Sequence, residues 1–276
     1  FAQSAQKLKP QLLEVLSRAD IKDRKKKYRA LIGLSKTGDK DICTHFEKFI
    51  LAKKDDWSER ALEFLVKEHK ERSVSLLRSL IAKSYLRYKS LGLLIDVGEQ
   101  KDFDQYKALL QHENFRYRIL AQRAFGRFGT EKEQEQAMLL AFGDKKHQVN
   151  FAAIASQSRI KATGIRNQLK VFAKEGKHLH QRLYAAEVIG RSLKKEDVQL
   201  LITALKDRYE LLSEKEMSLT VFSLGTYWLA KKFLTDSPEA GCRYARKKIA
   251  AHLEAITKEK FGTNVKKWEK WLETRE

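Results

Sequence analysis

Tyr117-Arg118-Ile119 begins an apolar helical stretch, and similar short segments recur about every 32 residues along the chain. The counterparts are Leu86-Arg87-Tyr88, Asn150-Phe151 and Arg182-Leu183-Tyr184. Helix pairs repeated at a fixed period cannot bury their apolar faces alone, so each pair must pack against its neighbours. The period therefore predicts an all-α fold, an elongated and curved α-solenoid of about seven helix pairs.

Glycines recur with the same period. Gly126 and Gly190 each follow a repeat arginine by eight residues, and Gly98 and Gly129 follow one by eleven. Because glycine commonly ends helices, the run from Gly126 to Gly129 predicts a helix C-terminus. The segment from Thr130 to Glu133 predicts a capping box that starts the next helix.

The apolar period of 3.6 residues predicts helices throughout the chain. They cover residues 7–18, 22–35, 42–50, 56–66, 73–82, 85–97, 103–110, 115–125, 131–142, 149–160, 163–173, 179–193, 196–205, 216–233, 239–256 and 265–273. The helix over 216–233 is the most apolar, so we expect it to be well buried. No segment shows sustained strand alternation, and no linker rich in Gly, Ser or Pro divides the chain. We therefore expect one continuous array over residues 1–276, with a final cap at about 239–276.

The Arg-x7-Gly spacing at 118–126 and 182–190 resembles the short HEAT-like repeats of bacterial proteins. The C-terminus is similar to the closing segment of many bacterial HEAT-repeat proteins, with Leu253 to Thr257, Phe261-Gly262, Trp268 and Trp271. In that family glycine usually follows the threonine, whereas this chain has Lys258. The resemblance implies a HEAT/armadillo-like solenoid with a C-terminal capping helix, and it implies little about function.

The formal net charge of +20 favours anionic partners such as nucleic acid, acidic lipid surfaces, cell-wall polymers or an acidic protein face. The alternative is a lysine-rich soluble surface without a dedicated anion site, because the basic residues are spread along the whole chain. Basic and aromatic residues interleave at Phe115-Arg116-Tyr117-Arg118 and from Arg243 to Lys248. Such clusters could hold phosphates and stack bases, or their stems could pack between repeats with the charges in solvent.

The chain starts at Phe1 with a small polar segment, which we interpret as the remainder after signal-peptide cleavage, although a trimmed start is the alternative. No run of 18 apolar residues occurs, so we expect no membrane span. Cys43 and Cys242 lie near opposite ends of the predicted array, so we expect neither to be bridged. In size, helical content, repeat pattern and start, the chain resembles the spirochaete flagellar-coiling proteins. That resemblance implies a periplasmic sheath component of flagellar filaments.

Residues for catalysis are scattered. His178 and His180 form the only close histidine pair, and a spacing of two is a poor chelate on a helix, so we interpret it as a surface turn. The stretch from Gly126 to Gly129 has the spacing of a GxxG phosphate clamp, but it follows a helix, so we interpret it as a C-cap. We expect no enzyme, no cofactor and no metal site. The tryptophans Trp57, Trp228, Trp268 and Trp271 are expected in the core or cap, and exposure of Trp268 with Trp271 would make a docking patch.

We predict a non-enzymatic scaffold whose partners are other proteins in a filament or envelope assembly. The expected partner-binding residues lie on second helices or adjoining turns: Arg87, Lys89, Arg116, Arg118, Arg123, Lys145, Lys146 and Arg182. A nucleic-acid backbone binder is the alternative from another class. A HEAT-like lyase or glycosylase is a third, for which the sequence names no pocket residue.

Overall fold

The computed structural model describes residues 2–18, 23–37, 41–52, 55–83, 86–157, 159–207 and 238–275. Throughout these ranges the regular structure is helical and no strand occurs, which confirms the predicted all-α class. The chain divides into two compact units, Phe1–Asp102 and Phe103–Glu276. The predicted helix over 216–233, and Trp228 within it, lie outside the described residues.

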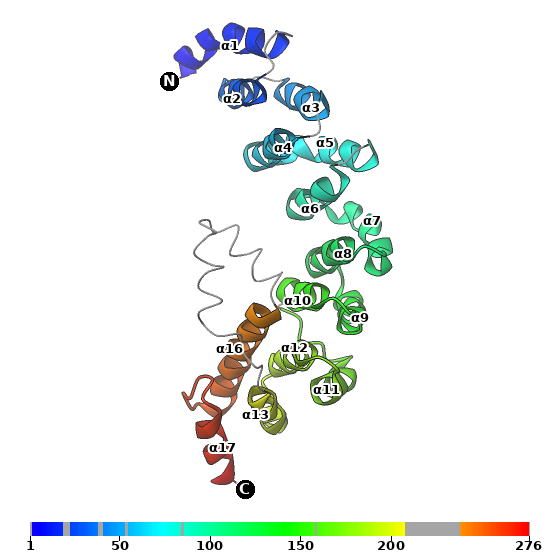
Figure 1. The fold of residues 1–276 in the computed structure, drawn as a ribbon, viewed down its shortest axis with the longest axis vertical. Helices are drawn as coiled ribbons and strands as arrows, with labels where there is room; N and C mark the ends of the chain where they lie inside the picture. Colours follow the sequence, from blue (N-terminus) through cyan, green and yellow to red (C-terminus); the bar gives the residue numbers. More distant parts are fainter. Residues whose placement is uncertain are drawn as a thin grey trace. The chain divides into compact units, whose positions relative to one another are not determined.

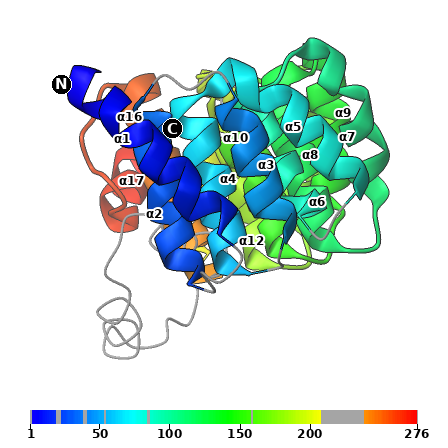
Figure 2. The same cartoon turned by 90° about the horizontal axis from the view of Figure 1, so that it is seen from above.

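Unit 1 consists of six helices and one 3-10 turn in the described part of the chain. They are α1 (Ala2–Ser17), α2 (Arg24–Ser35), α3 (Ile42–Ala52), α4 (Asp56–Glu68), α5 (Lys70–Lys83), α6 (Arg87–Val97) and η1 (Gln100–Asp102). Consecutive helices pack in pairs, and α2, α4 and α6 form one layer while α3 and α5 form the other (Figure 1). Figure 2, which views the N-terminal helices from above, shows α1 beside α2.

The core of unit 1 runs between its two layers, with Leu31, Phe46, Leu62 and Leu77 fully buried. A polar contact ties successive pairs together. Arg24 at the start of α2 donates from Nε to Oδ2 of Asp55 at 2.9 Å, and Asp55 in turn caps α4 by accepting from the Ser58 amide. Asp55 therefore caps the N-terminus of α4 and also binds Arg24 at the start of α2.

Unit 2 has the same kind of layers. Its elements are α7 (Asp104–Lys107), η2 (Ala108–Gln111), α8 (Phe115–Phe128), α9 (Glu131–Phe142), α10 (His147–Ser156), α11 (Arg166–Glu175), α12 (Leu179–Gly190), η3 (Lys195–Asp197), α13 (Val198–Lys206), α16 (Pro238–Thr257) and α17 (Val265–Glu273). We call α7 with η2, α9, α11 and α13 the first-helix layer, and α8, α10, α12 and α16 the second-helix layer. Each second helix contacts the next one, as Figure 1 shows for α8, α10 and α12.

The sequence predicted several element ends in unit 2 correctly. Thr130 and Glu133 form the predicted capping box, Gly143 ends α9, and α17 has the predicted bounds. In the final cap, Trp268 is fully buried and donates from Nε1 to the Gly262 carbonyl at 2.8 Å. Trp268 and Trp271 therefore pack as cap residues, and the exposed pair that would have made a docking patch is not formed.

The predicted helix over 103–110 is broken. In its place lie the single α-turn α7 and the 3-10 turn η2. The buried residues Phe103, Tyr106 and Leu109 are spaced by three, and a 3-10 helix places residues at that spacing on one face. Burial of this triplet explains why the segment departs from an α-helix.

The interpretation of Gly126 as part of a C-cap is wrong. Helix α8 continues through Gly126 to Phe128, and Gly129 alone is the cap residue. A Cβ at Gly126 would overlap the carbonyl oxygen of Ser156 on α10. At the equivalent Gly190 in α12, a Cβ would lie 2.7 Å from the His252 ring of α16. These glycines recur because neighbouring second helices approach closely there.

Within the described residues, no helix combines the length and the apolar character that crossing a bilayer requires. Cys43 and Cys242 are both free.

Candidate interaction surfaces

The repeat arginines Arg118 and Arg182 bind α8 and α12 to the C-terminal ends of their first helices. Arg118 donates from Nη1 to the His112 carbonyl at 2.7 Å, six residues back, and pairs through Nε with Asp144 at 2.6 Å. Arg182 does the same with the Gly176 carbonyl and Asp207, both at 2.8 Å. Each arginine thereby joins its own turn to the turn of the following pair.

In α10 and α16 a side chain also donates to a backbone carbonyl of a preceding turn. Asn150 occupies the repeat position in α10, and its side-chain amide donates to the Asp144 carbonyl, again six residues back, at 3.3 Å. Arg246 in α16 donates to the Asp207 carbonyl at 2.9 Å. Arg246 follows Arg182 by two full periods of the repeat, so α16 takes the place of a second helix beside α13.

Three of the eight predicted partner-binding residues, Arg118, Arg182 and Lys89, therefore pair with carboxylates inside the chain. The Arg118 and Arg182 side chains are 17% and 25% exposed, and both face an aspartate rather than solvent. Lys89 on α6 likewise pairs with Glu63 of α4. Their guanidinium and ammonium groups stabilise the helix packing, and whether a partner also touches them stays a prediction.

The remaining predicted residues gather mostly around α8. Arg116 and Arg123, together with Arg127, follow one another at spacings of seven and four residues, which places them on one face of the helix. Arg116 and Arg127 are exposed and Arg123 is half-buried. We call Arg116, Arg123 and Arg127 the α8 arginine face. Neither α8 nor the adjacent α10 contains an aspartate or glutamate.

The turn between α9 and α10 adds to this basic region. Lys145 and Lys146 are exposed there, and the Lys146 ammonium lies 5.9 Å from the centroid of the Phe115 ring at the start of α8. The structure thus brings Arg116, Arg118, Lys145 and Lys146 together at one end of α8. Arg87, exposed at the start of α6, belongs to unit 1.

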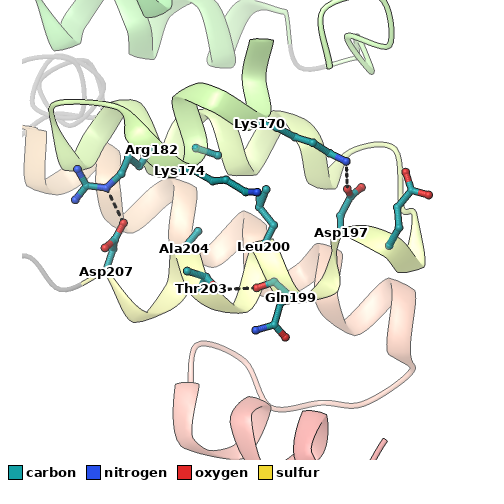
Figure 3. Close-up of a pocket in the computed structure, with 11 residues that line it drawn as sticks. Lys170, Lys174, Arg182, Asp197, Gln199, Leu200, Thr203, Ala204 and Asp207 are labelled. Carbon is teal, nitrogen blue, oxygen red and sulfur yellow. Dashed lines mark hydrogen bonds and ion pairs between the residues drawn. The ribbon is translucent and has the colours of Figure 1, made fainter. Parts of the chain in front are cut away.

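A groove of about 400 Å³ lies between α11 and α13 of the first-helix layer. Ala173, Leu200 and Ala204 form its apolar part. Figure 3 labels Leu200 and Ala204. Its charged lining comprises Lys170, Lys174, Arg182, Glu196, Asp197 and Asp207, with Gln199 and Thr203 as uncharged polar residues. Except for Arg182, none of these residues was singled out from the sequence, because the repeat signal lies on the second helices.

Three histidines meet at the first turns of α10 and α12. The rings of His178 and His180 stack with centroids 5.3 Å apart. The ring centroid of His147 lies 5.9 Å from that of His180. Burial, followed by the neighbouring His147 and His178, lowers the pKa of His180 to about 4. The proximity of His147, which belongs to the preceding helix pair, had no local sequence signal.

A buried polar cluster joins α12 to α16. Glu187 pairs with Arg191 at 2.6 Å and lies 3.6 Å from Nε2 of His252. Burial acts to raise the pKa of Glu187, but the adjacent His252 side chain and the charge of Arg191 outweigh it and hold that pKa below its ordinary value. Arg191 also donates to the Ile154 carbonyl at 2.9 Å, so the cluster connects three second helices.

In the part of the chain that the structure describes, no group of three or more His, Cys, Asp or Glu side chains is arranged to hold a metal ion. Comparison with known proteins gave no match to a family model, to a curated protein or to a solved structure.

Proposed function

We propose that this protein is a non-enzymatic scaffold that binds an acidic protein assembly through the α8 arginine face. Both units would then belong to one HEAT-like α-solenoid, in which each helix pair is stabilised by its neighbours. The assembly would be a filament or envelope structure outside the cytoplasm. The sheath of a periplasmic flagellum, which the resemblance to flagellar-coiling proteins suggests, is an assembly of this type.

The observation that supports the proposal is the absence of acidic residues from α8, which carries the arginine face, and from α10, which packs against α8. Helix α8 has four arginines and no carboxylate, and Arg118 is bound to an aspartate of the next turn. Helix α10 has no acidic side chain either, so no carboxylate of these two helices pairs with Arg116, Arg123 or Arg127. A surface with one sign of charge speeds association with partners of the opposite sign and orients them.

Part of the positive charge of the chain is paired with carboxylates inside the fold. Arg24, Arg118, Arg166, Arg182 and Arg191 are all paired with carboxylates inside the fold. Four of these pairs join neighbouring helices or turns, and Arg191 pairs with Glu187 of its own helix. Arg116, Lys145 and Lys146 are exposed, which supports their proposed contact with a partner.

A nucleic-acid backbone binder is the second candidate, because Phe115 and Tyr117 lie next to arginines of α8. Tyr117, however, packs on His112 with ring centroids 4.5 Å apart, and both rings are half-buried. Packing of this kind leaves less of each ring for base stacking. The acidic protein partner is therefore the better-supported candidate.

Fluorescence anisotropy of labelled poly-L-glutamate and of a labelled 20-base-pair DNA duplex tests the proposal. The variant Arg116→Gln/Arg123→Gln is compared with Lys266→Gln/Lys267→Gln, which removes the same charge from the exposed side of α17. We expect the α8 variant to bind poly-L-glutamate about tenfold more weakly, because each removed cation contributes several tenths of a kcal/mol or more. The α17 variant should bind almost as the unmodified protein does.

Equal losses in the two variants would mean that only net charge matters, and the α8 arginine face would have no special role. Tight duplex binding at 150 mM salt, with log affinity falling steeply as log salt rises, would favour the nucleic-acid candidate instead.

A further inference from the structure

The first-helix layer of unit 2 is packed differently at its successive interfaces. Between α9 and α11, the rings of Phe142 and Phe172 stack with centroids 5.7 Å apart and fill the space. Phe142 is fully buried and belongs to the main core. No comparable groove is therefore expected between these two helices.

The next interface, between α11 and α13, lacks this aromatic pair. The buried positions align Met138 and Phe142 of α9 with Leu169 and Ala173 of α11, and these in turn align with Leu201 and Leu205 of α13. In this alignment Ala173 stands where α9 has Phe142, and Ala204 stands where α11 has Phe172. Both alanines line the groove, so replacement of the two rings by methyl groups accounts for its volume.

The charges around the groove are paired at its ends and unpaired in its middle. Asp197 pairs with Arg166 and lies 3.8 Å from Lys170, while Asp207 pairs with Arg182 at the other end. Glu196 lies 3.4 Å from Arg166. Lys174 reaches from α11 over Leu200 (Figure 3), and none of the described carboxylates pairs with it. One ammonium group is therefore available inside the groove.

We infer that this groove binds a short, extended segment of a partner protein, with an aspartate or glutamate side chain of that segment paired to Lys174. The apolar part formed by Ala173, Leu200 and Ala204 would contact the remainder of the segment. At the edge, the Gln199 side-chain amide can donate to and accept from its backbone, and the Thr203 hydroxyl, which donates to the Gln199 backbone carbonyl at 2.8 Å, can still accept. A volume of about 400 Å³ lies within the range of small binding sites, which suits a few residues of chain. The site is separate from the α8 arginine face, and either can exist without the other.

A random heptapeptide library, selected on the full chain carrying Arg116→Gln/Arg123→Gln, tests the inference without a contribution from α8. The affinities of the selected peptides are then measured after adding Lys174→Gln or Ala204→Phe. Ala204→Phe places a phenyl ring at the position of α13 that is equivalent to Phe172 of α11. This ring should fill the groove. We expect the selected peptides to contain Asp or Glu, and each substitution to weaken their binding at least about tenfold. Changing the acidic residue of the peptide to its amide should have the same effect.

Circular dichroism and thermal unfolding establish that each variant is folded, and the exposed Lys174→Gln keeps the test valid if Ala204→Phe does not fold. Selection of no peptide, or of peptides that bind Ala204→Phe and Lys174→Gln undiminished, would overturn the inference. Free glutamate that binds as tightly as the peptides would also overturn it, because the site would then recognise a small anion. None of these results depends on the poly-L-glutamate experiment, so the two proposals can fail separately.

Discussion

At Gly126, a methyl group in place of the hydrogen would overlap the Ser156 carbonyl oxygen of α10. Backbone atoms cannot move aside as a flexible side chain can, so Gly126→Ala must separate α8 from α10. We expect the free energy of unfolding to fall by about 1 to 3 kcal/mol, the usual cost of overpacking. Gly143→Ala is the matched control, because the nearest atom to its Cβ lies at 3.6 Å and its φ of −77° suits alanine. Urea denaturation of both variants measures the difference, and equal stabilities would contradict the packing role of Gly126.

Lys258 has a φ of +70°, in the left-handed region that favours glycine. This is the position after Thr257 where the resembled HEAT-repeat segment usually has glycine. Lys258→Gly should therefore raise the free energy of unfolding by roughly 0.5 to 1 kcal/mol, because it relieves backbone strain at an exposed residue. Lys260→Gly, at a neighbouring exposed residue without positive φ, should give no such gain. A lower thermal midpoint for Lys258→Gly would show that the lysine side chain stabilises this turn.

His180 makes stability depend on pH. The pKa of His180 is about 4 in the folded chain and near 6.5 when unfolded, so the unfolded chain binds the proton more readily between these values. Its contribution is therefore complete above pH 6.5 and is lost as pH falls toward 4. After allowance for partial exposure of the ring, we expect a loss of roughly 1 to 2 kcal/mol between pH 7 and pH 4.5.

The variant His180→Gln should lose that part of the pH dependence, whereas His45→Gln on α3 should keep it. Urea denaturation at the two pH values measures it. The same slope in His180→Gln and in the unmodified chain would show that another group is responsible.

At the scale of the elements, ion pairs between arginines and aspartates join one helix pair to the next. Arg118 is 17% and Asp144 7% exposed, whereas Arg182 is 25% and Asp207 34% exposed. Removing one partner of the more buried pair leaves a poorly solvated aspartate. Arg118→Gln should therefore cost about 2 to 4 kcal/mol of unfolding free energy, and Arg182→Gln about 1 kcal/mol. Adding Asp144→Asn to Arg118→Gln should restore part of the loss, and a purely additive double variant would contradict the pairing.

The sequence predicted an element best where its bounds depend only on residues of that same element. The capping box at Thr130 and the bounds of α17 depend on residues within one helix, and both are as predicted. The segment 103–111 was missed because its buried residues have a period of three, close enough to 3.6 to resemble an α-helix over so short a length. Gly126 was taken for a cap because the atom that requires a glycine there belongs to Ser156, on the next second helix.

The candidate sites were less predictable for the same reason. Arg116, Arg123, Lys145 and Lys146 could be named because basic residues on a predicted second helix or an adjoining turn can be identified from the sequence alone. The pairing of Arg118 with Asp144 requires knowledge of which turns are adjacent. The groove between α11 and α13 arises from two alanines on different helices, and only the alignment of buried positions relates them to Phe142 and Phe172.

For the whole molecule, the proposal that both units form one solenoid has a direct consequence for size. Stacked helix pairs keep each other's apolar faces from water along a line, so the chain should be longer than a globular protein of equal length. A compact protein of 276 residues would have a radius of gyration of about 19 Å.

Small-angle X-ray scattering of the full chain at low concentration measures this radius directly. A solenoid should give a radius of gyration clearly above about 19 Å, with a distance distribution extended toward long distances. A radius no larger than that of the compact protein, with a symmetric distribution, would contradict the proposal, because helix pairs folded around a single centre would not present α8 as part of an extended binding surface.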